Sequence, residues 1–141
     1  MSTTGVAALD HTVQETNVWL RAVAEQLHFE DRQHAYNALR AVLHALRDRL
    51  SPEVAVHFGA QLPMLVRGLY YEGWHPGAHR SAQSVNAFCA RVHDAVDHDP
   101  GIDSEVVARA VFALIAARLS PSEIEDVIAA TPKSLHAIWP S

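Results

Sequence analysis

The chain has 141 residues, of which 49% are hydrophobic and 19% charged, so it carries enough apolar side chains for a folded core. The formal net charge of −5 argues against non-specific nucleic-acid binding, which needs a broad positive potential. One cysteine, Cys89, excludes an internal disulfide. No apolar run is long enough to cross a membrane, and residues 1–9 do not have the composition of a secretory signal. We therefore expect a cytoplasmic protein.

The first half of the chain carries the periodicity of helices. Apolar residues recur every three or four positions over residues 13–27 and again over 32–49, which predicts two amphipathic helices. Ser51 and Pro52 predict the start of a third helix, since Ser is a favoured N-cap and Pro fits the first helical position. Pro63 breaks that helix and can open a short fourth one.

The second half repeats this organisation. Residues 73–80 are rich in turn formers, and Ser81 is a candidate cap for the helix that follows. Ser120 and Glu123 have the spacing of a capping box around a proline, and Pro132 again breaks the helix. No segment alternates apolar and polar residues as a strand does. The sequence predicts an all-α protein with about eight helices.

An internal duplication underlies this likeness between the halves. The tetrapeptide Arg-Leu-Ser-Pro at 49–52 returns 69 residues further on, and residues 12–72 laid over 81–141 without a gap give 12 identities in 61 positions. This pattern predicts two four-helix repeats. We expect a flexible N-terminal tail over residues 1–11, a first repeat over 12–72, a joint over 73–80 and a second repeat over 81–140. Since a unit of this size is marginal alone, we expect one fused bundle with approximate two-fold symmetry.

The run Gln-Leu-Pro-Met-Leu-Val-Arg-Gly-Leu-Tyr-Tyr-Glu-Gly-Trp at residues 61–74 resembles a bacterial family known as domain of unknown function 2267. Residues 40–50, 110–114 and 123–132 fit the same family. The resemblance implies a small, duplicated, all-helical bacterial protein. It carries over no catalytic residue, because the family has none assigned.

Ten histidines raise the question of a metal site, since histidine is the commonest metal ligand. Glu25 and His28 have the carboxylate–x–x–His spacing of helical metal sites, and Asp94 and Asp97 stand at the corresponding positions of the second repeat. Helical phase, however, places Glu25 and His28 on the solvent side of the stripe that contains Val23. We favour an ordinary surface pair over a metal site here.

A second candidate metal group stands near the end of a helix and comprises His93, Asp94, Asp97 and His98. Acidic side chains oppose the helix dipole at a C-terminus, and either a bound cation or solvent would compensate. We favour solvent at this position, so no cofactor is expected. Metal or cofactor binding through histidines and carboxylates is the alternative function.

Other chemistry finds little support. Cys89 corresponds to Leu20, a core position in the first repeat, and a buried cysteine behaves as a small hydrophobe. The chain has no nucleophile-elbow, metalloprotease or phosphate-loop motif, so we favour a protein that is not an enzyme.

Residues 122–139 could form a helix-turn-helix, yet core packing is the better interpretation in an acidic chain. A DNA-binding regulator is the third hypothesis.

The remaining candidates are Leu69, Tyr70, Tyr71 and Trp74, an apolar and aromatic cluster beside the Gly-rich joint. Aromatic side chains anchor protein interfaces because they bury a large area at low entropy cost. The same residues could instead pack one repeat against the other. The sequence favours a non-enzymatic module that binds another protein or a second copy of itself, with these four residues as the anchors.

Overall fold

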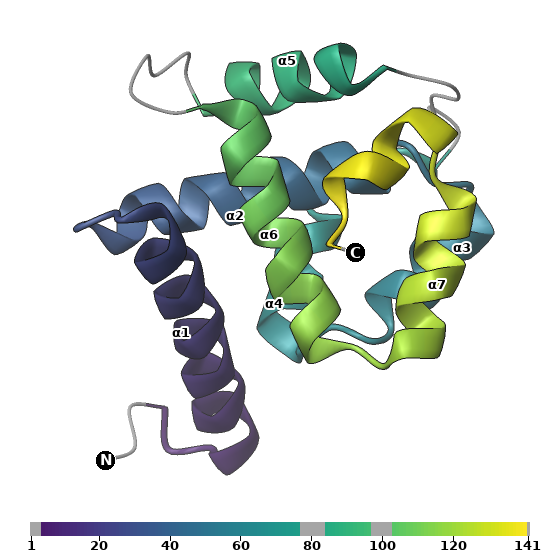
Figure 1. The fold of residues 1–141 in the computed structure, drawn as a ribbon. Coiled ribbons are helices and arrows are strands. Elements are labelled where there is room, and N and C mark those ends of the chain that lie inside the picture. Colours follow the sequence, from purple (N-terminus) through teal and green to yellow (C-terminus); the bar gives the residue numbers. More distant parts are fainter. Residues whose placement is uncertain (1–3, 77–83, 97–102, 141) are drawn as a thin grey trace.

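The structure is a computed structural model, and it describes residues 4–76, 84–96 and 103–140. These residues form eight helices and no strand, which confirms the expected fold class (Figure 1). The helices are α1 (Ala7–Leu27), α2 (Arg32–Arg47), α3 (Pro52–Gly59), α4 (Met64–Tyr71), α5 (Val85–Ala95), α6 (Ser104–Arg118), α7 (Pro121–Ala130) and the 3-10 helix η2 (Lys133–Ile138).

Several helices begin where the sequence places an N-cap residue. Ser51 accepts a hydrogen bond from the backbone N–H of Val54, and Ser120 accepts one from Glu123, so both Ser-Pro pairs start a helix as expected. Ser81, which we expected to cap the fifth helix, lies outside the described residues. The cap of α5 is Ser84, whose hydroxyl accepts from the N–H of Ala87 at 3.1 Å.

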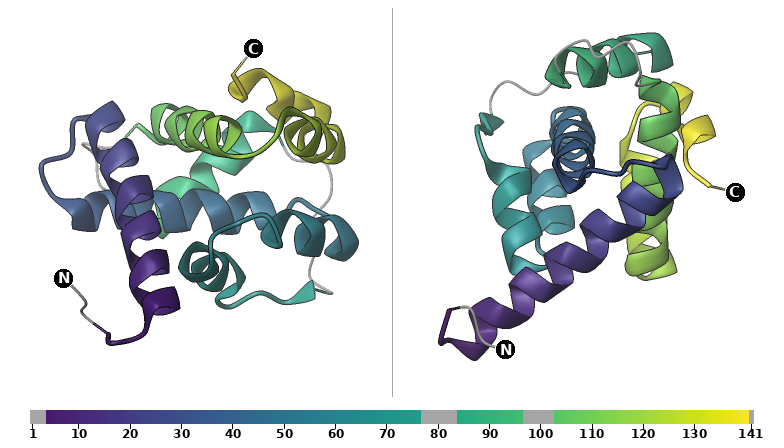
Figure 2. Two further views of the ribbon diagram at one scale, coloured as in Figure 1. Left: turned by 90° about the horizontal axis from the view of Figure 1, so that it is seen from below. Right: turned by 90° about the vertical axis from the view of Figure 1, so that its left-hand side faces the viewer.

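The start of the chain differs from the expectation. We assigned residues 1–11 to a flexible tail, but α1 begins at Ala7, and the backbone N–H and hydroxyl of Thr4 both donate to the Asp10 carboxylate. The first buried side chain of this helix is Thr12. The first turns of α1 therefore project from the body of the molecule, as Figure 2 shows in its right-hand view.

The centre of the bundle is α2, which contacts α1, α4, α5 and α6 (Figure 1). Ten of its sixteen residues are buried, among them Leu39, Leu43 and Leu46. A helix with most of its residues buried must be covered on several sides, and four neighbouring helices cover this one. The core is continuous from Trp19 in α1 to Trp139 beyond η2.

The two halves of the chain interlock. Helix α2 packs against α6 and α3 against α7, while α1 also contacts α6 and α5 also contacts α2. A two-fold axis between two similar halves would produce contacts of this kind. The duplication itself remains a prediction from the sequence. No helix within the described ranges is both long and apolar enough to cross a membrane.

Candidate functional site

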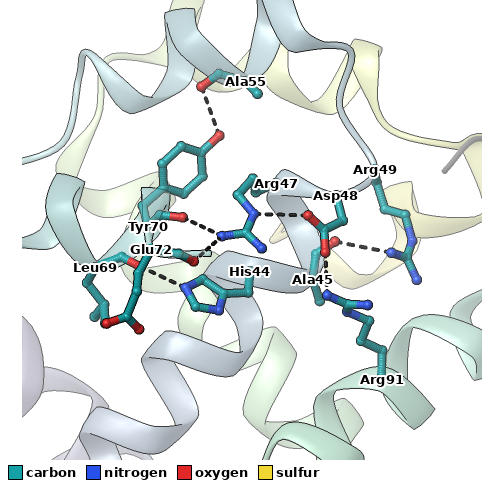
Figure 3. A network of polar contacts seen from close by, with 10 residues as sticks. All are labelled: His44, Ala45, Arg47, Asp48, Arg49, Ala55, Leu69, Tyr70, Glu72 and Arg91. Carbon is teal, nitrogen blue, oxygen red and sulfur yellow. Dashed lines mark hydrogen bonds and ion pairs between the residues drawn. The ribbon is translucent and has the colours of Figure 1, made fainter. Parts of the chain in front are cut away.

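A buried polar network holds the carboxyl end of α4 (Figure 3). From α2, His44 donates through Nε2 to the Leu69 carbonyl at 2.8 Å, and Arg47 donates to the carbonyls of Tyr70 at 3.0 Å and Glu72 at 2.8 Å. The last carbonyls of a helix have no partner within the helix, and a cation at this end is also attracted by the negative end of the helix dipole. Two side chains of α2 thus fix where α4 ends.

The network extends to α5 in the other half of the molecule. Arg47 Nε donates to the Asp48 carboxylate at 2.9 Å, and the second oxygen of that carboxylate pairs with Arg91. An exposed ion pair at 2.9 Å between Arg40 and Glu72 lies at its outer edge. Burial lowers the pKa of His44, the hydrogen bond to Leu69 opposes that shift, and the nearby Arg47 adds to it. His44 is therefore held in its neutral form.

Tyr70, one of the four predicted partner-binding anchors, lies in the core rather than on the surface. Its side chain is fully buried, its ring packs edge-on against Phe58 with centroids 5.4 Å apart, and its hydroxyl donates to the Ala55 carbonyl at 2.8 Å. Burial raises the pKa of this phenol far above its usual value. The residue ties α4 to α3 and has no surface to offer a partner.

The other three proposed anchors, Leu69, Tyr71 and Trp74, are half-buried and pack against the core. The ring of Tyr71 lies 5.0 Å from that of Tyr70 and 5.4 Å from that of Trp74, and its hydroxyl donates to the Val56 carbonyl at 3.3 Å. These aromatic contacts join α3, α4 and the turn after α4. They brace the first half internally, and only the outer edges of the three side chains reach solvent.

The residues considered for a metal do not converge within the part of the chain that the structure describes. Glu25 and His28 are exposed, and the backbone of His28 takes a left-handed conformation to end α1. His93 is half-buried and Asp94 exposed on α5, whereas Asp97 and His98 lie outside the described residues. Within the described ranges, no group of three or more His, Cys, Asp or Glu side chains is arranged to hold an ion.

Two other features considered from the sequence are Cys89 and the possible helix-turn-helix over residues 122–139, and both are partly buried in the structure. Cys89 is half-buried on α5, and burial followed by the nearby Glu105 and Asp103 raises the pKa of its thiol. Residues 122–139 form α7 and the short helix η2, with Leu135 and Ile138 in the core. A recognition helix needs a free face for the major groove, and η2 uses its few residues to cover the core.

Sequence reasoning missed an apolar surface where α4 begins beside α1. Met64 and Leu65 are 55% and 47% exposed, and the backbone N–H of Leu65 donates to the Thr12 hydroxyl at 2.9 Å. Leu9, which is 43% exposed, precedes Thr12 by about one turn of α1, and Val6, which is 50% exposed, is the residue just before this helix. We call Val6, Leu9, Met64 and Leu65 the α1–α4 surface.

A signal for this surface was present in the duplicated sequence. The positions that correspond to Met64 and Leu65 in the second half are Lys133 and Ser134, and these are exposed as well. An exposed position normally carries a polar residue, as the second half does here. Two apolar residues at equally exposed positions mark the first half as different, and adjacent exposed apolar residues often mark an interaction surface.

These features define a small all-helical protein whose candidate site is an apolar surface. A family model described as an uncharacterized conserved protein, DUF2267, matches residues 16–138, which is most of the chain. The protein belongs to this family, as its resemblance over residues 61–74 predicted. No curated protein matches the chain.

Proposed function

We propose that the protein is a non-enzymatic interaction module that associates with a second copy of itself through the α1–α4 surface. The observation that carries the proposal is the exposure of Met64 and Leu65 at the start of α4, where the backbone N–H of Leu65 donates to Thr12 of α1. Covering solvent-exposed apolar side chains lowers the free energy of the protein by roughly 25 cal/mol per Å² removed from water. The projecting first turns of α1 extend this surface beyond the body of the molecule.

A second copy fits the chemistry of the surface. In a two-fold dimer the same surface of both copies forms the interface, so its residues must pack favourably against an identical set of residues. The four residues of the α1–α4 surface carry no charge, so self-pairing places no like charges together. Four half-exposed side chains cover less than the roughly 800 Å² per partner of a standard interface, so we expect a reversible dimer that depends on concentration.

The test is the oligomeric state of the whole chain across a range of concentrations, measured by sedimentation velocity or light scattering. We expect the native protein to pass from monomer to dimer as its concentration rises. Met64→Asp introduces a charge into the interface while favouring the fold, because an acidic residue stabilises the first turn of a helix. This variant is expected to remain monomeric at every concentration.

Ser134→Asp is the matched control, since Ser134 is exposed at the corresponding end of η2. It adds the same charge and is expected to dimerise as the native protein does. A native protein that stays monomeric up to millimolar concentration would refute the proposal. So would a Met64→Asp variant that dimerises with unchanged affinity and keeps its helical circular dichroism spectrum.

A further inference from the structure

A cavity of about 480 Å³ lies where α1 meets the α3–α4 turn and the junction of α6 with α7. This volume is in the range of small-molecule sites. Its apolar wall includes Val18, Trp19, Leu62 and Leu119, and the guanidinium-bearing residues Arg67 and Arg118 also line it. Trp19 is only 3% exposed, so this part of the wall is set rigidly in the core.

Arg118 is the residue that gives the cavity a chemical preference. It is exposed at the end of α6, and among the described residues it makes no hydrogen bond or ion pair. Glu123, an acid in the first turn of the next helix, is hydrogen-bonded to another residue. With its amide nitrogen turned toward α7, Gln61 donates to the two carboxylate oxygens of Glu123 at 3.0 and 3.2 Å.

The other arginine of the repeated Arg-Leu-Ser-Pro sequence shows what Arg118 lacks. Arg49 is only 2% exposed, its guanidinium carbon lies 5.6 Å from the centre of the Phe88 ring, and it donates to the Ala45 carbonyl. Phe88 corresponds to Trp19 in the duplicated sequence. The first arginine is thus packed against its aromatic partner, whereas Arg118 and Trp19 face a shared cavity.

The remaining charged groups at this cavity already have partners. Arg67 donates to the carbonyls of Gly59 at 3.1 Å and Leu62 at 2.9 Å, and so serves the end of α3. Glu15 lies 3.0 Å from His11, one turn earlier on α1. The guanidinium of Arg118 is therefore the cation at this cavity that lacks a partner among the described residues.

We infer that this cavity binds a small monocarboxylate with an apolar body, with Arg118 receiving the carboxylate and Val18 and Leu119 contacting the body beside the buried edge of Trp19. A planar guanidinium pairs with a carboxylate through two parallel hydrogen bonds, which orients the ligand as well as holding it. Glu15 at the same cavity disfavours ligands with two negative charges. The site does not depend on the proposed dimer, since Met64 and Leu65 do not line it.

The experiment titrates phenylacetate into the whole chain and follows the indole N–H of Trp19 by nitrogen–proton correlation NMR, with Trp19→Phe used to assign that signal. We expect a saturable shift with the native protein. Arg118→Gln is expected to weaken phenylacetate binding at least about tenfold, because a charge-assisted bidentate pair is lost. Arg118→Lys, which keeps the charge without the planar fork, is expected to fall between them.

Three controls make the result specific. Arg21→Gln removes another exposed arginine of the same region, on α1, and should bind phenylacetate as the native protein does. The neutral analogue 2-phenylethanol should bind at least about tenfold more weakly than phenylacetate. The titration is repeated in the Met64→Asp background, which is expected to remain monomeric, so failure of the dimer and failure of this site are distinguished.

The inference is overturned if phenylacetate gives no saturable shift, or if Arg118→Gln binds it as tightly as the native protein. Equal affinity for 2-phenylethanol would also overturn it, since the carboxylate would then have no role. Inorganic phosphate provides the last outcome. A shift of the Trp19 signal as large as that caused by phenylacetate would indicate a general anion site and would refute the apolar part of the inference.

Discussion

The guanidinium of Arg47, almost fully buried on α2, donates a hydrogen bond to the main-chain carbonyl of Tyr70, 23 residues further along the chain. The same nitrogen reaches the Glu72 carbonyl, and Nε pairs with Asp48. One side chain therefore closes the end of α4 and orders the turn after it. The corresponding residue of the second half is Ala116, which cannot make these hydrogen bonds, so the second half does not share this way of closing a helix end.

Replacing Arg47 with alanine should destabilise the fold by about 3–5 kcal/mol, since the change removes the donor to two main-chain carbonyls at the end of α4 and one of the two arginines that pair with Asp48. Urea unfolding followed by circular dichroism measures this loss. Arg40→Ala is the matched control, because its ion pair with Glu72 is exposed and worth at most about 1 kcal/mol. Equal losses for the two variants would contradict the role given to Arg47.

His44 should make the protein less stable as pH falls. Because burial lowers the pKa of the folded residue, the unfolded chain takes up this proton at a higher pH than the folded chain does. The contribution of His44 is therefore complete above about 6.5, the usual histidine pKa, and is lost as pH falls below it. Urea unfolding at pH 7.5 and pH 5.5 tests this.

His44→Gln retains an N–H near the Leu69 carbonyl and does not titrate, so it should lose less stability between these pH values than the native protein. His57→Gln, at an exposed position of α3, should keep the native pH dependence. An unchanged pH dependence in His44→Gln would show that this buried ring does not carry the effect.

Two helical glycines should respond in opposite ways to alanine. A Cβ on Gly59 would collide with the phenol of Tyr71, whereas a Cβ on Gly68 meets nothing within 4 Å. Gly68→Ala should stabilise the protein by about 0.5–1 kcal/mol through helix propensity. Gly59→Ala should destabilise it by about 1–3 kcal/mol, as overpacked sites do.

The double variant Gly59→Ala/Tyr71→Leu checks the cause of that loss. It should be less destabilised than the sum of the two single variants, because the leucine side chain leaves room for the new methyl group. Thermal or urea unfolding of the four proteins completes the cycle. Additive losses would mean that Gly59 is constrained by something other than the Tyr71 ring.

The thiol of Cys89 should react slowly. Its raised pKa lowers the thiolate fraction at neutral pH, and partial burial limits access. At pH 7.5 we expect modification by 5,5′-dithiobis(2-nitrobenzoate) to be at least about tenfold slower in the folded protein than in guanidinium-unfolded chain. A folded rate equal to or above the unfolded rate would indicate an activated cysteine.

The sequence by itself determined the helical fold class and several helix ends. Periodicity at three and four residues and the Ser-Pro pairs at 51–52 and 120–121 act within a few residues of chain, so they can be recognised without the tertiary structure. The same reasoning placed Glu25 and His28 on the exposed side of α1, where they lie. It assigned too long a tail, because the side chains of residues 7–11 are not buried and so give the first turns of α1 no apolar stripe to recognise.

Only the tertiary structure decided which apolar residues are covered. Tyr70 and Leu65 both belong to α4, yet Tyr70 lies under α3 while Leu65 faces solvent beside Thr12. Identical Arg-Leu-Ser-Pro sequences place Arg49 against Phe88 and leave Arg118 exposed at a cavity. Local sequence sets the spacing of side chains along a helix, but the elements that pack against each face come from distant parts of the chain. Burial, pairing and exposure at the candidate sites therefore follow from long-range packing.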